Sequence, residues 1–156
     1  MDIGAPMPHV ITNGGKTIVV FHAGLPADPA WDGTDVTIIR PSSQQSYDLA
    51  WVKFEGVAAT LLGPPNDEAI SGHPLWTAGL EPYCFHIVEN STWRSDYTSR
   101  NRVHPHHNAE RWNRLNHYLI TFHDETFECL ATNHTSGATR STLRTKLNEL
   151  IDDLLG

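Results

Sequence analysis

The sequence predicts an α+β domain: a single, mostly antiparallel β-sheet of about seven or eight strands, with a C-terminal helix packed on one face. Short runs rich in Val, Ile, Thr, Tyr and Phe alternate with turn residues along most of the chain, a pattern typical of strands joined by turns. Helical spacing of Leu and Ile is clearest only over residues 139–155. Strands followed by a late helix indicate a sheet with one face buried under helices.

The stretch 117–132, HYLITFHDETFECLAT, predicts a β-hairpin with a two-residue turn at 124–125. Such a turn would place Thr121 opposite Glu128. Alternation along the two strands assigns six side chains to a core face: Tyr118, Ile120, Phe122, Phe127, Cys129 and Ala131. The opposite face would mix apolar and titratable groups: His117, Leu119, Thr121, His123, Thr126, Glu128 and Leu130.

The first part of the chain contains one clear hairpin signal. Residues 9–12 and 16–22 are β-prone runs separated by Asn-Gly-Gly, which supplies the positive φ angles that tight hairpin turns require. Residues 23–35 contain prolines, glycines and aspartates and predict a loop, and residues 36–40 predict a short strand.

The middle of the chain adds further strands. Residues 47–55 and 57–62 flank Gly56 and predict either two strands with a tight turn or one long strand with a bulge. The proline-rich segment 63–76 cannot continue a strand, and residues 83–90 predict the next one.

Two short helices are expected between the late strands. Residues 91–101 can form the first, with Thr92 as a candidate N-cap, and residues 108–116 can form the second, capped by Asn108. The prediction is therefore a flexible N-terminus, residues 1–8, followed by one α+β domain, residues 9–156.

Composition and charge exclude several classes of protein. The chain has 156 residues, with 39% hydrophobic and 19% charged residues, which excludes a disordered chain. No apolar run approaches the roughly 20 residues of a membrane helix, and the first residues lack the pattern of a secretion signal. A net charge of −7 argues against nucleic-acid binding. The expected compartment is the cytoplasm, with Cys84 and Cys129 as reduced thiols rather than a disulfide.

The main candidate for chemistry is the pair His123 and Glu128 on the titratable face of the hairpin. With the two-residue turn they would be diagonal neighbours, roughly 7–8 Å apart between α-carbons, so that the carboxylate could orient the imidazole. At about 3.3 Å per residue, His117 would lie near 20 Å from His123 and outside this small site. The alternative is a solvent-exposed Glu128 and a His123 that only caps the turn.

Two further residues are candidates for a second proton carrier. Glu89 lies at the end of the predicted strand 83–90, where it would be either at the rim of the sheet or desolvated with a raised pKa. His73 lies in the segment 63–76, whose prolines and glycines predict a loop of fixed shape, and loops held on a scaffold often carry function.

The histidine cluster at residues 104–107 suggests a metal. Imidazoles suit zinc, and His104 and His107 are the candidate ligands for a divalent metal such as zinc, alone or in a site shared with His123 and Glu128. The spacing matches no familiar zinc motif, and a solvated loop is the alternative.

Together these features predict a small enzyme that uses His/Glu acid–base chemistry, with or without a metal, on a small molecule, as a lyase, isomerase or hydrolase. His123 would act as general acid or base, and the site would lie at a sheet edge covered by loops 63–76 and 101–108. The competing hypothesis is an acidic, non-catalytic binding or inhibitor protein of the immunity type that blocks a basic partner. A homodimer is a third expectation.

Overall fold

The computed structural model describes residues 1, 6–24, 42 and 44–156. The predicted strand 36–40 and most of the predicted loop 23–35 therefore lie outside the described residues. Residues 2–5 of the predicted flexible N-terminus also lie outside them, and the division at residue 9 stays a prediction.

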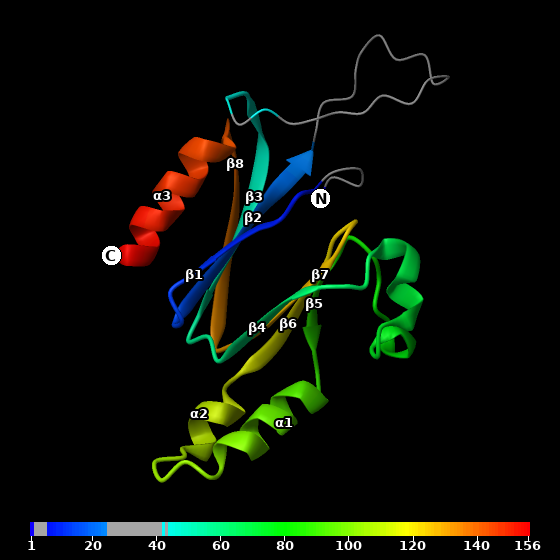
Figure 1. The fold of residues 1–156 in the computed structure, drawn as a ribbon, viewed down its shortest axis with the longest axis vertical. Helices are drawn as coiled ribbons and strands as arrows, with labels where there is room; N and C mark the ends of the chain where they lie inside the picture. The colour runs from blue at the N-terminus through cyan, green and yellow to red at the C-terminus, as the bar shows by residue number, and fades with distance from the viewer. Residues whose placement is uncertain (2–5, 25–41, 43) are drawn as a thin grey trace.

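The described residues form two separate antiparallel sheets of four strands each (Figure 1), so the prediction of a single sheet is wrong. The first sheet has the order β1-β2-β3-β8, which are His9–Thr12, Lys16–Gly24, Ser46–Glu55 and Asn133–Thr142. The second has the order β4-β7-β6-β5, which are Ala59–Gly63, Thr126–Ala131, Asn116–Thr121 and Phe85–Val88.

The chain crosses from one sheet to the other at a shared corner, and this corner explains the error. β3 leads into β4 through Gly56, whose φ is +62°, and β7 leads into β8 through Thr132. The backbone N–H and the hydroxyl of Thr132 both donate to the carbonyl oxygen of Glu55, each at 2.9 Å. Alternation reveals which face a residue is on, but not that two consecutive strands separate into different sheets.

A continuous apolar core fills the space between the two sheets. Its buried members come from both sheets and include Val19, Phe21, Val52 and Phe54 from the first sheet, and Tyr118, Ile120, Phe127, Cys129 and Ala131 from the second. At about 25 cal/mol per Å2 of apolar surface, this burial is the main favourable contribution to folding.

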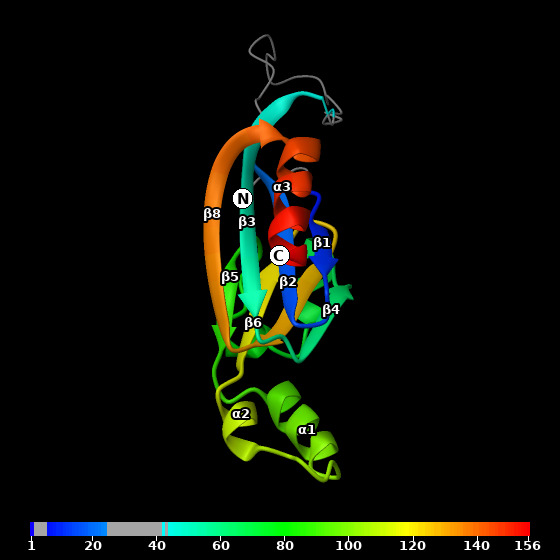
Figure 2. The same cartoon turned by 90° about the vertical axis from the view of Figure 1, so that its left-hand side faces the viewer.

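The C-terminal helix α3, Leu143–Leu155, covers the outer face of the first sheet (Figure 2), as the leucine pattern predicts. Leu150 and Leu154 pack against Ile18 and Val20 of β2, whose alternate residues face the other sheet. The helix begins later than predicted because β8 continues to Thr142, whose hydroxyl accepts from the N–H of Thr145 at 3.1 Å.

The outer face of the second sheet is covered by shorter elements. Two 3-10 turns, η1 (Asp67–Gly72) in the proline-rich segment and η2 (Trp76–Ala78) at its end, come first, and Ile70 packs on Leu119 of β6. Two short helices follow β5, namely α1, Thr92–Asn101, and α2, Ala109–Asn113. No helix in the described part of the chain is both long and apolar enough to cross a membrane.

The β6–β7 hairpin confirms the predicted faces but corrects the pairing. All six side chains assigned to the core face belong to the inter-sheet core. However, Thr121 pairs with Thr126 and Leu119 with Glu128, so the loop spans residues 122–125, and Phe122 donates its N–H to the carbonyl of Glu125 at 2.9 Å. Successive side chains of a strand point to alternate faces, so a shift of the pairing by two residues leaves every side chain on its predicted face. Only the cross-strand neighbours of each residue change.

Candidate functional site

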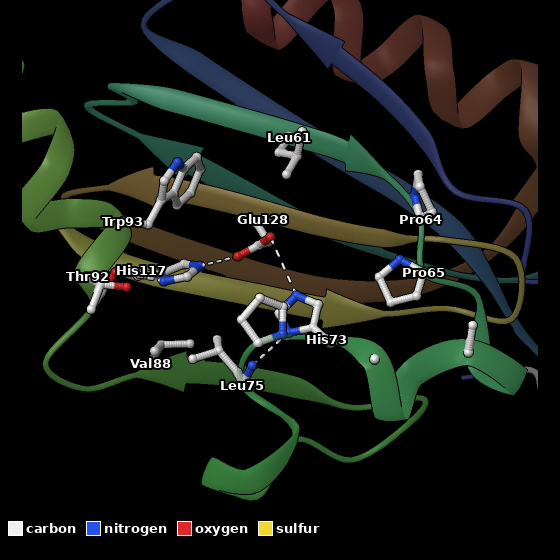
Figure 3. A pocket seen from close by; sticks show the side chains of 14 residues that line it. Leu61, Pro64, Pro65, His73, Leu75, Val88, Thr92, Trp93, His117 and Glu128 are labelled. Atoms are coloured by element: carbon white, nitrogen blue, oxygen red, sulfur yellow. Dashed lines mark hydrogen bonds and ion pairs between the residues drawn. The ribbon is translucent and has the colours of Figure 1, made fainter.

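A pocket of about 560 Å3 lies on the outer face of the second sheet, a size typical of small-molecule sites. Its floor carries His117 of β6 and Glu128 of β7, and Leu61 of β4 flanks them (Figure 3). The segment 64–75 and the start of α1 form the walls. Of the two segments predicted to cover a site around His123 and Glu128, segment 63–76 lines this pocket through residues 64–75, and segment 101–108 does not line it.

Glu128 is the centre of the polar group in this pocket. Its carboxylate oxygens lie 2.7 Å from Nε2 of His117 and 3.7 Å from Nε2 of His73, so the side chain stands between two imidazoles (Figure 3). Burial is the largest single influence and opposes ionisation, but the hydrogen bond and charge of His117, with the charge of His73, hold the pKa of Glu128 below its usual value. The side chain is only 12% exposed and is ionised at neutral pH.

His117 is fixed by hydrogen bonds at both ring nitrogens. Since the Glu128 carboxylate accepts, Nε2 carries a proton, and in the singly protonated ring Nδ1 accepts from the hydroxyl of Ser91 at 2.9 Å. His117 and Ser91 are each only 3% exposed, and the Trp93 ring packs edge-on against the imidazole at 5.0 Å. These contacts hold the tautomer and the ring orientation.

His73 reaches the same carboxylate from the proline-rich segment. Its Nδ1 accepts from the N–H of Leu75 at 3.1 Å, which leaves the proton on Nε2, the nitrogen facing Glu128. The turn that positions it is closed by the N–H of His73 donating to Ile70 at 2.9 Å. His73, which the sequence suggests as a site residue, therefore lies beside Glu128. Its catalytic role stays a prediction.

Ser91 is the residue that sequence reasoning missed. It is the N-cap of α1, in place of the predicted Thr92, and its hydroxyl oxygen accepts from the N–H of Arg94 at 3.0 Å. The guanidinium of Arg94 donates to the carbonyl of Leu115 at 3.0 Å, which ties the helix start to the strand carrying His117. A serine after a predicted strand indicates a cap, but no sequence pattern brings it to a histidine 26 residues away.

His123 lies in a different cluster, so its predicted pairing with Glu128 is wrong. The real offset places Glu128 diagonally across from His117 instead, which also overturns the expectation that His117 lies outside the site. Nδ1 of His123 contacts the carboxylate of Asp67 at 2.9 Å, and the hydroxyl of Tyr83 bonds to the same carboxylate oxygen.

We expect the pKa of His123 to fall toward its ordinary value of 6.5 when Asp67 is replaced by asparagine. The hydrogen bond from His123 to Asp67 raises the pKa of the imidazole, against partial burial, which lowers it. Because the pKa of His123 is raised in the folded state, the interaction stabilises the fold fully at pH values below 6.5, the ordinary pKa of histidine. This stabilisation is lost as the pH rises through the folded-state pKa. NMR titration of the ring carbons measures the change.

Asp124→Asn is the control for this titration, because Asp124 acts on His123 only through its charge at 3.9 Å and should shift the pKa less. Equal titration of His123 in the wild type and in Asp67→Asn would contradict the interaction.

Glu89 lies apart from the pocket around Glu128. It is exposed beyond the end of β5 and lines a separate hollow of about 340 Å3 with Leu80 and His86. Of the two environments considered for Glu89, the structure therefore places it at the rim, in contact with water.

The histidines proposed as metal ligands have other partners. His104 is exposed, and its Nδ1 accepts from the N–H of His106 at 3.1 Å. His107 donates through Nδ1 to Asn101 of α1 at 3.0 Å and stacks on Trp112 of α2, so it connects the two helices. Within residues 6–24 and 44–156, no three His, Cys, Asp or Glu side chains are grouped so that they could hold a metal ion.

Both cysteines are free thiols, in agreement with the prediction. Burial raises the pKa of Cys129 to about 12 and also raises the pKa of Cys84, so neither is disposed to act as a thiolate nucleophile.

Fold and site together define a two-sheet α+β domain with a buried Ser–His–Glu group at the floor of a largely apolar pocket. No family model, curated protein or solved structure matches this chain.

Proposed function

We propose that this protein is an enzyme that moves protons on a small molecule bound in the pocket above His117 and Glu128. The observation that carries the proposal is the ionised carboxylate of Glu128, placed between two imidazoles in a pocket otherwise lined mainly by apolar side chains. A carboxylate that orients a buried imidazole and stabilises its protonated form is a recurring feature of general acid–base catalysis.

The proposed roles follow from the tautomers. Nδ1 of His117 is the ring nitrogen available to take up a proton, because Nε2–H is already bonded to Glu128. His73 keeps an N–H directed toward the same carboxylate and can supply or share a second proton. This arrangement replaces the predicted His123–Glu128 centre but keeps the predicted class of chemistry.

We expect Glu128→Gln to slow turnover by about 10²–10⁴-fold while the fold remains intact, because glutamine has the same shape and still accepts from His117 but carries no charge. Small carbonyl compounds, carboxylate esters and hydroxy acids would be incubated with the protein in D2O. One-dimensional proton NMR then reports binding, hydrogen–deuterium exchange and conversion in the same sample.

Glu149→Gln is the matched control, since this carboxylate is on α3, outside the pocket, and its ion pair is with Lys146 at 3.1 Å. Glu149→Gln should convert the compounds at the wild-type rate. Val88→Trp places a larger side chain in the wall of the pocket, so it should block binding. Equal conversion by the wild type and Glu128→Gln would contradict the role of Glu128, whereas compounds that bind without any conversion would contradict an enzyme. Binding without conversion would favour the competing proposal of a binding protein, which rests on the small size of the chain, its net charge of −7 and its five Trp and four Tyr residues.

A further inference from the structure

The connection between β5 and α1 places a serine at the start of a helix, directly against the histidine of the pocket. Strand β5 ends at Val88, a tight turn follows in which Asn90 has a left-handed φ of +52°, and Ser91 then caps the helix. A strand, a sharp turn, a serine and a helix in succession form the local geometry that presents a nucleophilic hydroxyl in many hydrolases, although the GxSxG sequence is absent here and Ser91 is only 3% exposed, at the lining of the pocket.

Hydrogen bonds connect this serine to a base and the base to a carboxylate. The hydroxyl of Ser91 donates to Nδ1 of His117 at 2.9 Å, and Nε2–H of His117 donates to Glu128 at 2.7 Å. This is the arrangement of nucleophile, base and orienting acid, with the two ring nitrogens exchanged relative to the familiar triad. All three side chains line the same pocket.

The helix start supplies the remaining element that acyl transfer requires. The N–H of Arg94 donates to the Ser91 oxygen and stabilises negative charge on it. The N–H groups of Thr92 and Trp93 belong to the first turn of α1, and neither donates to another described residue. Donors placed directly after the nucleophile can stabilise the oxyanion of a tetrahedral intermediate.

We infer that Ser91 is the nucleophile of an esterase acting on carboxylic esters with a small apolar acyl group. This inference rests on the proposed function, because it assigns a reaction to the same pocket. The walls that would hold the acyl group are apolar and come from three segments, with Leu61, Leu75 and Val88 among them (Figure 3).

The reaction balances without any further reagent. The Ser91 oxygen bonds to the ester carbonyl carbon as its proton passes to Nδ1 of His117. The bond to the leaving oxygen then breaks, and His117 returns the proton to it, which releases an alcohol and leaves an acyl-serine. Water attacks the acyl carbon, His117 takes its proton and returns it to the Ser91 oxygen, and a carboxylic acid is released.

A phosphonofluoridate tests the inference directly, because an activated serine displaces its fluoride and keeps the phosphonyl group. We expect one phosphonyl group per chain, located on Ser91 by peptide mass spectrometry. Labelling should be absent in Ser91→Gly and about 10²–10⁴-fold slower in His117→Gln. With p-nitrophenyl butyrate, the wild type should release p-nitrophenolate in a burst of about one equivalent per chain.

Glycine is used at position 91 because it is an adequate N-cap, so that α1 is retained without the hydroxyl. Asn108→Gly is the matched control, since it replaces the N-cap of α2 with glycine at a position outside the pocket. Ser91 in this variant should be labelled at the wild-type rate. A label on any other residue would overturn the role of Ser91.

The failure of this inference can be told apart from failure of the proposed function. If Ser91 stays unlabelled while small molecules are still converted in a manner that depends on Glu128, then Ser91 only caps the helix and the proposed function stands. If neither labelling nor conversion occurs, both are wrong.

Discussion

Replacing Gly56 with alanine is expected to lower the free energy of unfolding by about 2–5 kcal/mol, because two separate costs add at this position. Gly56 has a φ of +62°, which an L side chain adopts at a cost of about 1–2 kcal/mol. In addition, a Cβ at this position would overlap the hydroxyl and methyl groups of Thr132. Urea denaturation followed by circular dichroism measures the loss.

Two variants separate these costs. Gly14 also has a positive φ, of +84°, but no atom lies within 4 Å of a Cβ placed there, so Gly14→Ala should show only the backbone cost of about 1–2 kcal/mol. The double variant Gly56→Ala/Thr132→Ala removes the overlap with the hydroxyl and methyl and should recover part of the loss. Equal destabilisation at Gly14 and Gly56 would show that the contact between the two crossing connections is unimportant.

The second large effect is expected at Phe54, where alanine should cost about 3–5 kcal/mol. Phe54 is on β3 of the first sheet and is fully buried. Its ring centroid lies 5.3 Å from Tyr118 and 5.7 Å from Phe127, both on the second sheet. The substitution therefore leaves a cavity between the two sheets and removes aromatic contacts from both sides of it.

A double-mutant cycle with milder substitutions tests whether these contacts join the sheets. We expect a coupling of about 0.5–1.5 kcal/mol between Phe54→Leu and Phe127→Leu. Ile87→Ala, at a side chain that is 56% exposed, is the control and should change stability by no more than about 0.5 kcal/mol. No coupling between Phe54 and Phe127 would contradict the packing of the two sheets through this core.

Local pattern predicted the faces of strands and the amphipathic helix. The alternation from Tyr118 to Ala131 correctly predicts the side chains of the hairpin that face the core between the sheets. The spacing of leucines correctly predicts that α3 packs on a sheet. Both predictions are correct because the side-chain periods of two residues in a strand and 3.6 in a helix are set by the backbone. An element that is buried on one side therefore has apolar residues at that spacing in its sequence.

The hairpin shows where local pattern stops. A loop that is two residues longer than predicted leaves the alternation unchanged, yet it moves Glu128 from the neighbourhood of His123 to that of His117. Side-chain period therefore specifies faces and not pairing offset, which is decided by the geometry of the loop and by packing on the other sheet.

The amino-acid sequence by itself determined the α+β class, the two-faced strands and the residue types available for proton transfer. Only the tertiary structure decided that the strands divide into two sheets at Gly56 and Thr132, and that Ser91, His73, His117 and Glu128 meet in one pocket. The physical reason is that these four side chains come from four different segments. Their proximity depends on loop closure and core packing between distant parts of the chain, which no periodicity within a single segment encodes.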